Sequence, residues 1–152
     1  MNHKNISSCM PYIEVDQSGK IEDLRQNTVV SFSNDTFLSV YLDRRIKRQI
    51  FFKYRPHVRQ IVQKMFSICL YYLLEQHIAK KNAVIICKEY PGWEDFIKKE
   101  LYRLLNKEFD DTVQFRSIGK KSKAHEIAIL TNRQVLKSMK TLRKQDILKY
   151  LK

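Results

Sequence analysis

The chain has 152 residues, of which 43% are hydrophobic, and 29 lysines and arginines against 16 aspartates and glutamates give it a formal net charge of +13. This length is sufficient for one compact domain, and three widely spaced cysteines (Cys9, Cys69 and Cys87) exclude a disulfide framework and a paired-cysteine metal knuckle. No apolar run reaches the ~18 residues of a membrane span and no secretory leader opens the chain, which predicts a cytoplasmic protein without a membrane partner.

The first third of the chain predicts an antiparallel meander of three strands. Residues 12–16 alternate, with Ile13 and Val15 on one side and Glu14 and Asp16 on the other. Residues 28–32 and 37–42 are rich in β-branched and aromatic side chains, and a Ser-Asn-Asp turn at 33–35 separates them. The aromatic stretch 50–54 is expected to extend the same layer.

The second part of the chain predicts alternating helices and strands. Apolar residues recur at intervals of three and four over 57–78, which indicates a long and largely buried helix. The apolar run 83–87 indicates a strand covered on both faces, 93–108 is again helical, and 112–118 indicates a last strand.

A helix is expected after Gly119, capped by Ser122, with an apolar stripe of Ala124, Ile127, Ala128, Thr131 and Val135. We therefore predict a single domain over 1–152, with a core at about 11–135 and a basic amphipathic helix at 136–152. That last helix has two possible roles, docking on an acidic partner or pairing in a homodimer through its apolar residues Leu136, Met139 and Leu142.

The positive charge is clustered, and a stretch from 44 to 74 contains no acid. Clustered cations bind polyanions by releasing counterions from phosphates, so DNA or RNA is the expected partner. Two other interpretations stay open, a basic surface without a dedicated ligand and, as the weakest, an anionic membrane. The residues predicted to contact nucleic acid are Arg44, Arg45, Lys47, Arg48, Arg55, Lys120, Lys121 and Lys123.

Two acids are expected to meet at one edge of the sheet. Glu89 follows the strand at 83–87, and strands joined through a helix become parallel neighbours, so this strand is expected beside the one that carries Asp16. Ligand sites of open α/β sheets form at the carboxyl edge of the strands. Two carboxylates in contact repel each other unless a cation intervenes, and their oxygens suit Mg²⁺ or Mn²⁺. A metal site that activates water on a phosphodiester is therefore predicted.

The helix after Gly119 offers His125 and Glu126 as a third ligand. At ~100° per residue, His125 borders the apolar stripe while Glu126 points away from the sheet. His125 is the predicted ligand, and a histidine bonded to a backbone carbonyl at the edge of the core is the structural alternative. Tyr90 and Trp93 beside Glu89 have two possible roles, stacking on a base or packing under the turn.

The stretches YIEVDQSG, AVIICKEY and GKKSKAHEIA, together with the order of elements, resemble the ribonuclease-H-like superfamily, nearest its Holliday-junction resolvase branch. The resemblance implies a mixed five-stranded α/β sheet, with the meander and two parallel strands flanked by helices. It also implies Asp16 as a bridging metal ligand, Glu89 as the second ligand and His125 as third ligand or water-orienting base.

The chain departs from that family where a second acid often follows on the last helix, because Ala128 stands at this place. A sparse metal site and a lost activity both fit this departure. Two functions are thus expected from the sequence: a divalent-metal-dependent endonuclease, or a non-catalytic nucleic-acid-binding protein on the same scaffold. Metal binding is expected to depend on pH through His125 alone, with both acids already ionised near neutrality.

Overall fold

Six strands form one mixed sheet in the order β5-β4-β1-β2-β3-β6. The structure, a computed structural model, describes residues 12–33, 37–78, 83–117, 123–132 and 140–151. Strands β1 (Tyr12–Ser18), β2 (Thr28–Ser33) and β3 (Phe37–Leu42) form the antiparallel meander that the sequence predicts. Strand β4 (Ala83–Cys87) runs parallel to β1, and β5 (Val113–Arg116) runs parallel to β4.

The predicted number of five strands is wrong, because the two-residue strand β6 (Lys140–Thr141) pairs with β3 at the far edge. Such a short strand has no periodicity of its own, so only its pairing with Val40 and Tyr41 identifies it. The turn predicted at 33–35 lies largely outside the described residues.

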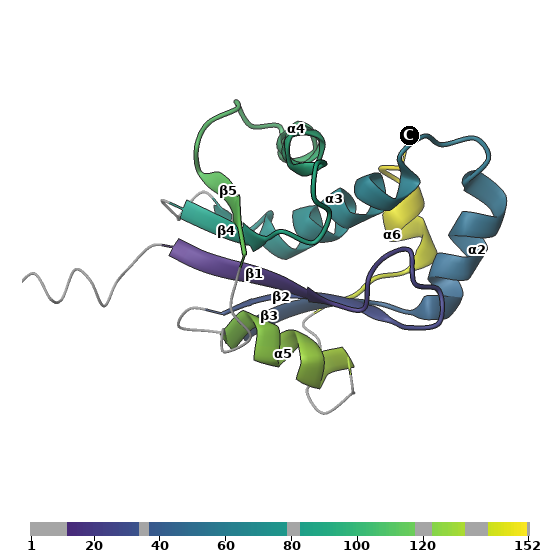
Figure 1. The fold of residues 1–152 in the computed structure, drawn as a ribbon. Coiled ribbons are helices and arrows are strands. Elements are labelled where there is room, and N and C mark those ends of the chain that lie inside the picture. The colour runs from purple at the N-terminus through teal and green to yellow at the C-terminus, as the bar shows by residue number, and fades with distance from the viewer. Residues whose placement is uncertain (1–11, 34–36, 79–82, 118–122, 133–139, 152) are drawn as a thin grey trace, which may run out of the picture.

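Helices cover both faces of the sheet. Helices α3 (Ile61–Leu74), α4 (Glu94–Leu105) and α6 (Lys144–Leu148) lie on one side and α5 (Lys123–Asn132) on the other, while α2 (Arg44–Tyr54) stands at one end (Figure 1). The longest described helix has 14 residues, and none in the described part of the chain is long and apolar enough to cross a bilayer.

The strand predicted at 50–54 is wrong, because these residues form the last turns of α2. Asp43 caps the helix by accepting a hydrogen bond from the amide of Arg45 at 2.7 Å. Ile50 and Phe51 are buried on the inner face of the helix, while Phe52 faces solvent. The aromatic content that suggested a strand therefore belongs to a capped amphipathic helix.

The continuous helix predicted over 136–152 is also wrong. Strand β6 and the short helix α6 share this segment, and Leu142, Ile147 and Leu151 are buried in the main core. Tyr72 on α3 donates a hydrogen bond to the carbonyl of Asp146 at 2.8 Å, which ties α6 to the rest. Leu142 is therefore not available for the dimer contact predicted for it, and Leu136 and Met139 lie outside the described residues.

The two faces of β1 have different neighbours. Ile13 and Val15 are buried in the hydrophobic core together with residues of α3 and α4. Asp16 faces the other side, where α5 packs on β1, β2 and β3. Ser31 and Ser39 are buried and paired with each other there, and the Ser31 hydroxyl donates to the carbonyl of Ala124 at 2.8 Å. Small side chains thus let α5 lie close to the sheet beside Asp16.

The predicted apolar stripe of α5 is confirmed for its described members, since Ala124, Ile127 and Ala128 are buried. The side chain of Thr131 and residue Val135 lie outside the described part. Beyond α5 the same sheet face is more open, because Gln114 and Arg116 of β5 are exposed and Cys87 of β4 is partly exposed. Asp16 therefore lies where a covered part of the sheet meets an open part.

Candidate metal centre

Asp16 is a buried carboxylate that is hydrogen-bonded to its own strand and to α5. Its side chain is 3% exposed. Oδ1 accepts from the backbone amide of Gln17 at 2.8 Å, and Oδ2 lies 2.6 Å from Nδ1 of His125 on α5. A buried carboxylate is costly unless its oxygens are satisfied, and here both oxygens have a partner. The pairing with α5 thus fixes the direction of Asp16.

The parallel pairing of β1 with β4 brings the second acid to Asp16. Val15 pairs with Ile86, so the next residues, Asp16 and Cys87, are neighbours across the two strands. Ligand atoms of Asp16, Cys87 and Glu89 all lie within 4.8 Å of one another, and we call these three residues the Asp16 cluster. The predicted approach of Asp16 and Glu89 is thus present, and their catalytic roles stay predictions.

Cys87 is the member of the Asp16 cluster that the sequence analysis missed. The spacing of the cysteines excluded a paired-cysteine site, and a single cysteine on a strand does not by itself predict a metal ligand. The signal was its position two residues before Glu89, because alternate residues of an extended chain point to the same side. A hydrogen bond with the Cys87 side chain acts on the carboxyl of Glu89 and favours the ionised form.

Glu89 holds a proton more tightly than an ordinary glutamate. Burial, and then the hydrogen bond and charge of Asp16, raise its pKa from 4.5 to about 7. Cys87 and the ammonium group of Lys20 act in the opposite direction and do not cancel the shift. The expectation that both acids are ionised near neutrality is therefore wrong, and Glu89 adds a titration of its own to the site.

This shift predicts how stability changes with pH. A carboxyl whose pKa is raised on folding stabilises the protein below pH 4.5, and this contribution is lost as the pH rises through 7. The shift corresponds to roughly 3 kcal/mol, which solvent screening at a partly exposed group lowers to about 1 to 2 kcal/mol. Without added metal at pH 8, Glu89→Gln is therefore expected to unfold at higher denaturant concentration than the wild type.

The measurement is urea unfolding of both proteins in EDTA from pH 4.5 to 8. The difference between the two free energies of unfolding is the quantity to follow, because the titration of groups that do not interact with Glu89 cancels in it. A difference that stays flat across this range would contradict the raised pKa of Glu89.

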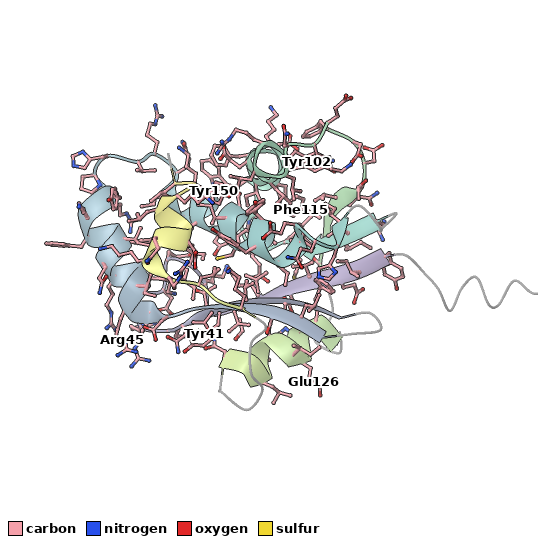
Figure 2. All side chains as sticks on the ribbon, turned by 180° about the vertical axis from the view of Figure 1, so that it is seen from behind. Tyr41, Arg45, Tyr102, Phe115, Glu126 and Tyr150 are labelled. Carbon is pink, nitrogen blue, oxygen red and sulfur yellow. The ribbon has the colours of Figure 1, made fainter. Side chains whose placement is uncertain are left out.

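His125 and Glu126 lie on different faces of α5, as the helical spacing predicts. The His125 side chain is 27% exposed and contacts Asp16, whereas Glu126 is exposed and points away from the sheet (Figure 2). Among the described residues, the Asp16 cluster does not include the His125 ring. His125 thus reaches the centre through Asp16, which favours a positioning or water-orienting role over that of a direct ligand.

The predicted nucleic-acid contacts fall into three groups. Arg44, Arg45, Arg48 and Arg55 are exposed, and Arg45 points outward from α2 while pairing with Asp43 at 3.1 Å (Figure 2). Lys120 and Lys121 lie outside the described residues, and Lys123 begins α5 without a described side chain.

Lys47 is a correction to that prediction, because its side chain is 0% exposed and cannot reach a phosphate. Its ammonium group donates to the carbonyl of Lys20 at 3.0 Å, the carbonyl of Asp23 at 2.8 Å and the hydroxyl of Thr28 at 2.9 Å. Burial lowers its pKa from 10.5 to about 8. The residue is an internal tie between α2 and the segment after β1.

That segment connects α2 to the Asp16 cluster. Lys20 donates from its ammonium group to the carbonyl of Glu89 at 2.8 Å, so Lys47, Lys20 and Glu89 form one chain of contacts. Gly19 begins the turn with φ of +76°, and an added Cβ would lie 2.0 Å from the carbonyl of Asn27. Only glycine fits this turn, which therefore brings Lys20 to Glu89.

Tyr90 packs under the turn, as one of the two interpretations expects. It is 7% exposed, donates to the side chain of Gln17 at 3.1 Å and accepts from the amide of Ile21 at 3.0 Å. Trp93 is 37% exposed and lies edge-on to Phe96. Tyr90 is thus unavailable for stacking on a base.

No protein-family model matches this sequence, and comparison with curated proteins and with solved structures gives no significant match either.

Proposed function

We propose that the protein is a divalent-metal-dependent endonuclease that hydrolyses phosphodiester bonds in nucleic acid, of the ribonuclease-H-like, resolvase type. The observation that carries the proposal is the convergence of two carboxylates, Asp16 and Glu89, of which Glu89 retains a proton to about pH 7. Perturbed carboxyls in contact are typical of catalytic and metal sites. The net charge of +13 favours a polyanionic substrate.

The topology supports the ribonuclease-H-like assignment. An antiparallel meander is followed by two parallel strands on the other side of β1, which is the arrangement that the resemblance implies. The three proposed site residues, Asp16, Glu89 and His125, come from β1, from the segment just after β4 and from α5, again as the resemblance implies. The additional strand β6 extends the opposite edge and leaves this arrangement unchanged.

The donor set fits a divalent cation at the Asp16 cluster. Carboxylate oxygens of Asp16 and Glu89 suit Mg²⁺ or Mn²⁺, while the thiol of Cys87 is a softer donor that suits Mn²⁺ better than Mg²⁺. A bound ion would supply Lewis-acid activation of water and of the phosphodiester oxygen.

The residues of the chain prepare this chemistry. The amide of Gln17 and the ring of His125 keep Asp16 directed at the cluster, and Glu89 must release its proton before it binds a cation. His125 also lies in position to orient water, because its ring is partly exposed beside Asp16. Cation binding is therefore coupled to proton release from Glu89.

This coupling predicts a pH-dependent metal affinity. With a pKa of about 7 for Glu89, the ionised fraction rises roughly ten-fold between pH 6 and pH 8, and the apparent affinity for Mn²⁺ is expected to rise by about the same factor. Thermal melting of the protein under a Mn²⁺ titration at the two pH values measures it. Glu89→Gln is expected to remove most of the difference, and equal affinities in the wild type would contradict the coupling.

The decisive test of the function is cleavage itself. Purified protein is incubated with fluorescent linear and branched DNA and with single-stranded and duplex RNA, in Mg²⁺, Mn²⁺ or EDTA. Internal cleavage of at least one substrate with metal, and none with EDTA, is the expected result. Binding without metal-dependent cleavage of any substrate would contradict the proposal.

A second candidate is a non-catalytic nucleic-acid-binding protein on the same scaffold. One observation favours it: Asp16 is already satisfied by Gln17 and His125, and Glu89 shares a hydrogen bond with Asp16, so the cluster is balanced without an ion. The cleavage assay separates the two functions, because this candidate binds nucleic acid equally in EDTA and in Mg²⁺ and cuts none.

A further inference from the structure

Phe52 is the most exposed large hydrophobic residue of the described chain. It lies near the C-terminal end of α2 and is 91% exposed, compared with 55% for Phe109 and 37% for Trp93. Its neighbours on the helix show that this is not a fraying end, because Ile50 is fully buried and Phe51 is 4% exposed. The helix thus packs two apolar residues inward and directs a third toward solvent.

Cations surround Phe52. At ~100° per residue, Phe52 points about 140° away from Lys47, about 160° from Ile50 and about 100° from Phe51, so it lies outside the buried face of the helix. The exposed residues around it define what we call the α2 outer face: Arg44, Arg45, Arg48, Gln49, Phe52, Lys53 and Arg55. The helix contains no acid, and the carboxylate of its cap, Asp43, is already occupied by Arg45. The face is one aromatic ring within a field of positive charge.

The composition of this face favours nucleic acid over other partners. A helix that inserts into a membrane or docks in a protein groove presents several apolar side chains on one stripe, and here the apolar surface is a single ring. Arginines and lysines that pair with phosphates beside an aromatic ring that stacks on a base are the usual elements of single-strand recognition. The positive charge and the single exposed ring of the α2 outer face therefore favour a polyanion with accessible bases.

We propose that the α2 outer face binds nucleic acid that carries unpaired bases, with Phe52 stacking on one base and the neighbouring arginines contacting the adjacent phosphates. Bases inside a duplex are already stacked on both sides and must be unstacked before a side chain can insert between them, so a ring carried on a helix surface stacks more readily on an unpaired base. The inference rests on the proposed function for nucleic acid as the partner, and it narrows that partner to strands with unpaired bases. It does not depend on the Asp16 cluster or on cleavage.

The test is binding in EDTA, where no metal-dependent cleavage takes place. Fluorescence anisotropy measures the affinity of wild type, Phe52→Ala and Phe52→Tyr for a single-stranded DNA and for a blunt duplex of matched length. Phe52→Ala is expected to weaken single-strand binding roughly 5- to 100-fold and to leave duplex binding within two-fold or so. Phe52→Tyr retains an aromatic ring and is expected to bind as the wild type does.

Two matched variants serve as controls. Phe109→Ala removes an exposed ring whose centroid lies 5.2 Å from that of Tyr102. Phe109 is far along the chain from α2, so this variant is expected to leave both affinities unchanged. Arg44→Gln removes one exposed cation of the α2 outer face. It is expected to lower the affinity for the single strand and for the duplex by the same factor, because contacts with phosphates do not depend on base pairing.

Three results would overturn the inference: unchanged binding by Phe52→Ala, an equal loss for single strand and duplex, or an equal loss in Phe109→Ala. Binding of the wild type to phosphatidylserine vesicles that Phe52→Ala abolishes, with single-strand binding retained, would instead assign the face to membranes. Failure of the nuclease proposal looks different, since single-strand binding would then stay sensitive to Phe52 while no substrate is cut with metal.

Discussion

Asp16→Asn is expected to lower metal-dependent cleavage by roughly 10³-fold or more, the largest effect on activity among the variants proposed. Asp16 is the acid that contacts both other parts of the centre, because it hydrogen-bonds with His125 and lies within 4.8 Å of Cys87 and Glu89. Asparagine keeps the size of the side chain and one acceptor oxygen, which suits the amide of Gln17, and removes the negative charge. Cation binding is therefore lost while β1 and α5 keep their packing.

Glu14→Gln is the matched control, since Glu14 lies two residues earlier on the same face of β1 and outside the Asp16 cluster. Initial cleavage rates in Mn²⁺ and the rise in melting temperature on adding Mn²⁺ are measured for the three proteins. Glu14→Gln is expected to match the wild type in both measurements. Cleavage by Asp16→Asn at the wild-type rate would exclude this centre as the site of the reaction and leave a nuclease elsewhere in the molecule.

Lys47→Ala is expected to destabilise the fold by about 2 to 4 kcal/mol, the largest effect on stability of the variants considered. The substitution empties the space of a fully buried side chain and removes the hydrogen bonds that the ammonium group donates to the carbonyls of Lys20 and Asp23 and to the hydroxyl of Thr28. Lys47→Met fills most of the space and is expected to cost about half as much. Urea unfolding at pH 7 measures both, and equal stability of Lys47→Ala and wild type would show that the tie contributes nothing.

The pH dependence identifies the ammonium group itself. Because burial lowers the pKa of Lys47 to about 8, the unfolded chain binds the proton more tightly than the folded one between pH 8 and 10.5. The stability of the wild type relative to Lys47→Met is therefore expected to rise across this window and to be constant below it. A relative stability that falls with pH would contradict the lowered pKa.

Sequence patterns predicted the elements whose periodicity is local. The alternation of β1 and the apolar run of β4 are confirmed, and their parallel pairing brings Asp16 to Cys87 and Glu89. Helix α2 was missed because its aromatic residues favour a strand, whereas its cap at Asp43 and the inward spacing of Lys47, Ile50 and Phe51 decide for a helix. The helix signal in the sequence was present, but the strand preference of the aromatic residues outweighed it.

Other features depend on contacts between distant parts of the chain. Strand β6 exists only through its pairing with β3, and Lys47 reads as a surface cation until the turn after Gly19 encloses it. The raised pKa of Glu89 needs both burial and the proximity of Asp16. None of these follows from spacing along one segment, so sequence reasoning located the two acids and missed the raised pKa of Glu89.

The close packing of α5 on the sheet limits which substitutions position 31 can accept. Ser31 lies opposite Asp16 on the neighbouring strand, is fully buried and bonds to the carbonyl of Ala124, the residue before His125. A larger side chain at position 31 is expected to push α5 away from the sheet and to lengthen the contact between the His125 ring and Asp16. A small buried residue that lies outside the Asp16 cluster thus controls how closely His125 approaches Asp16.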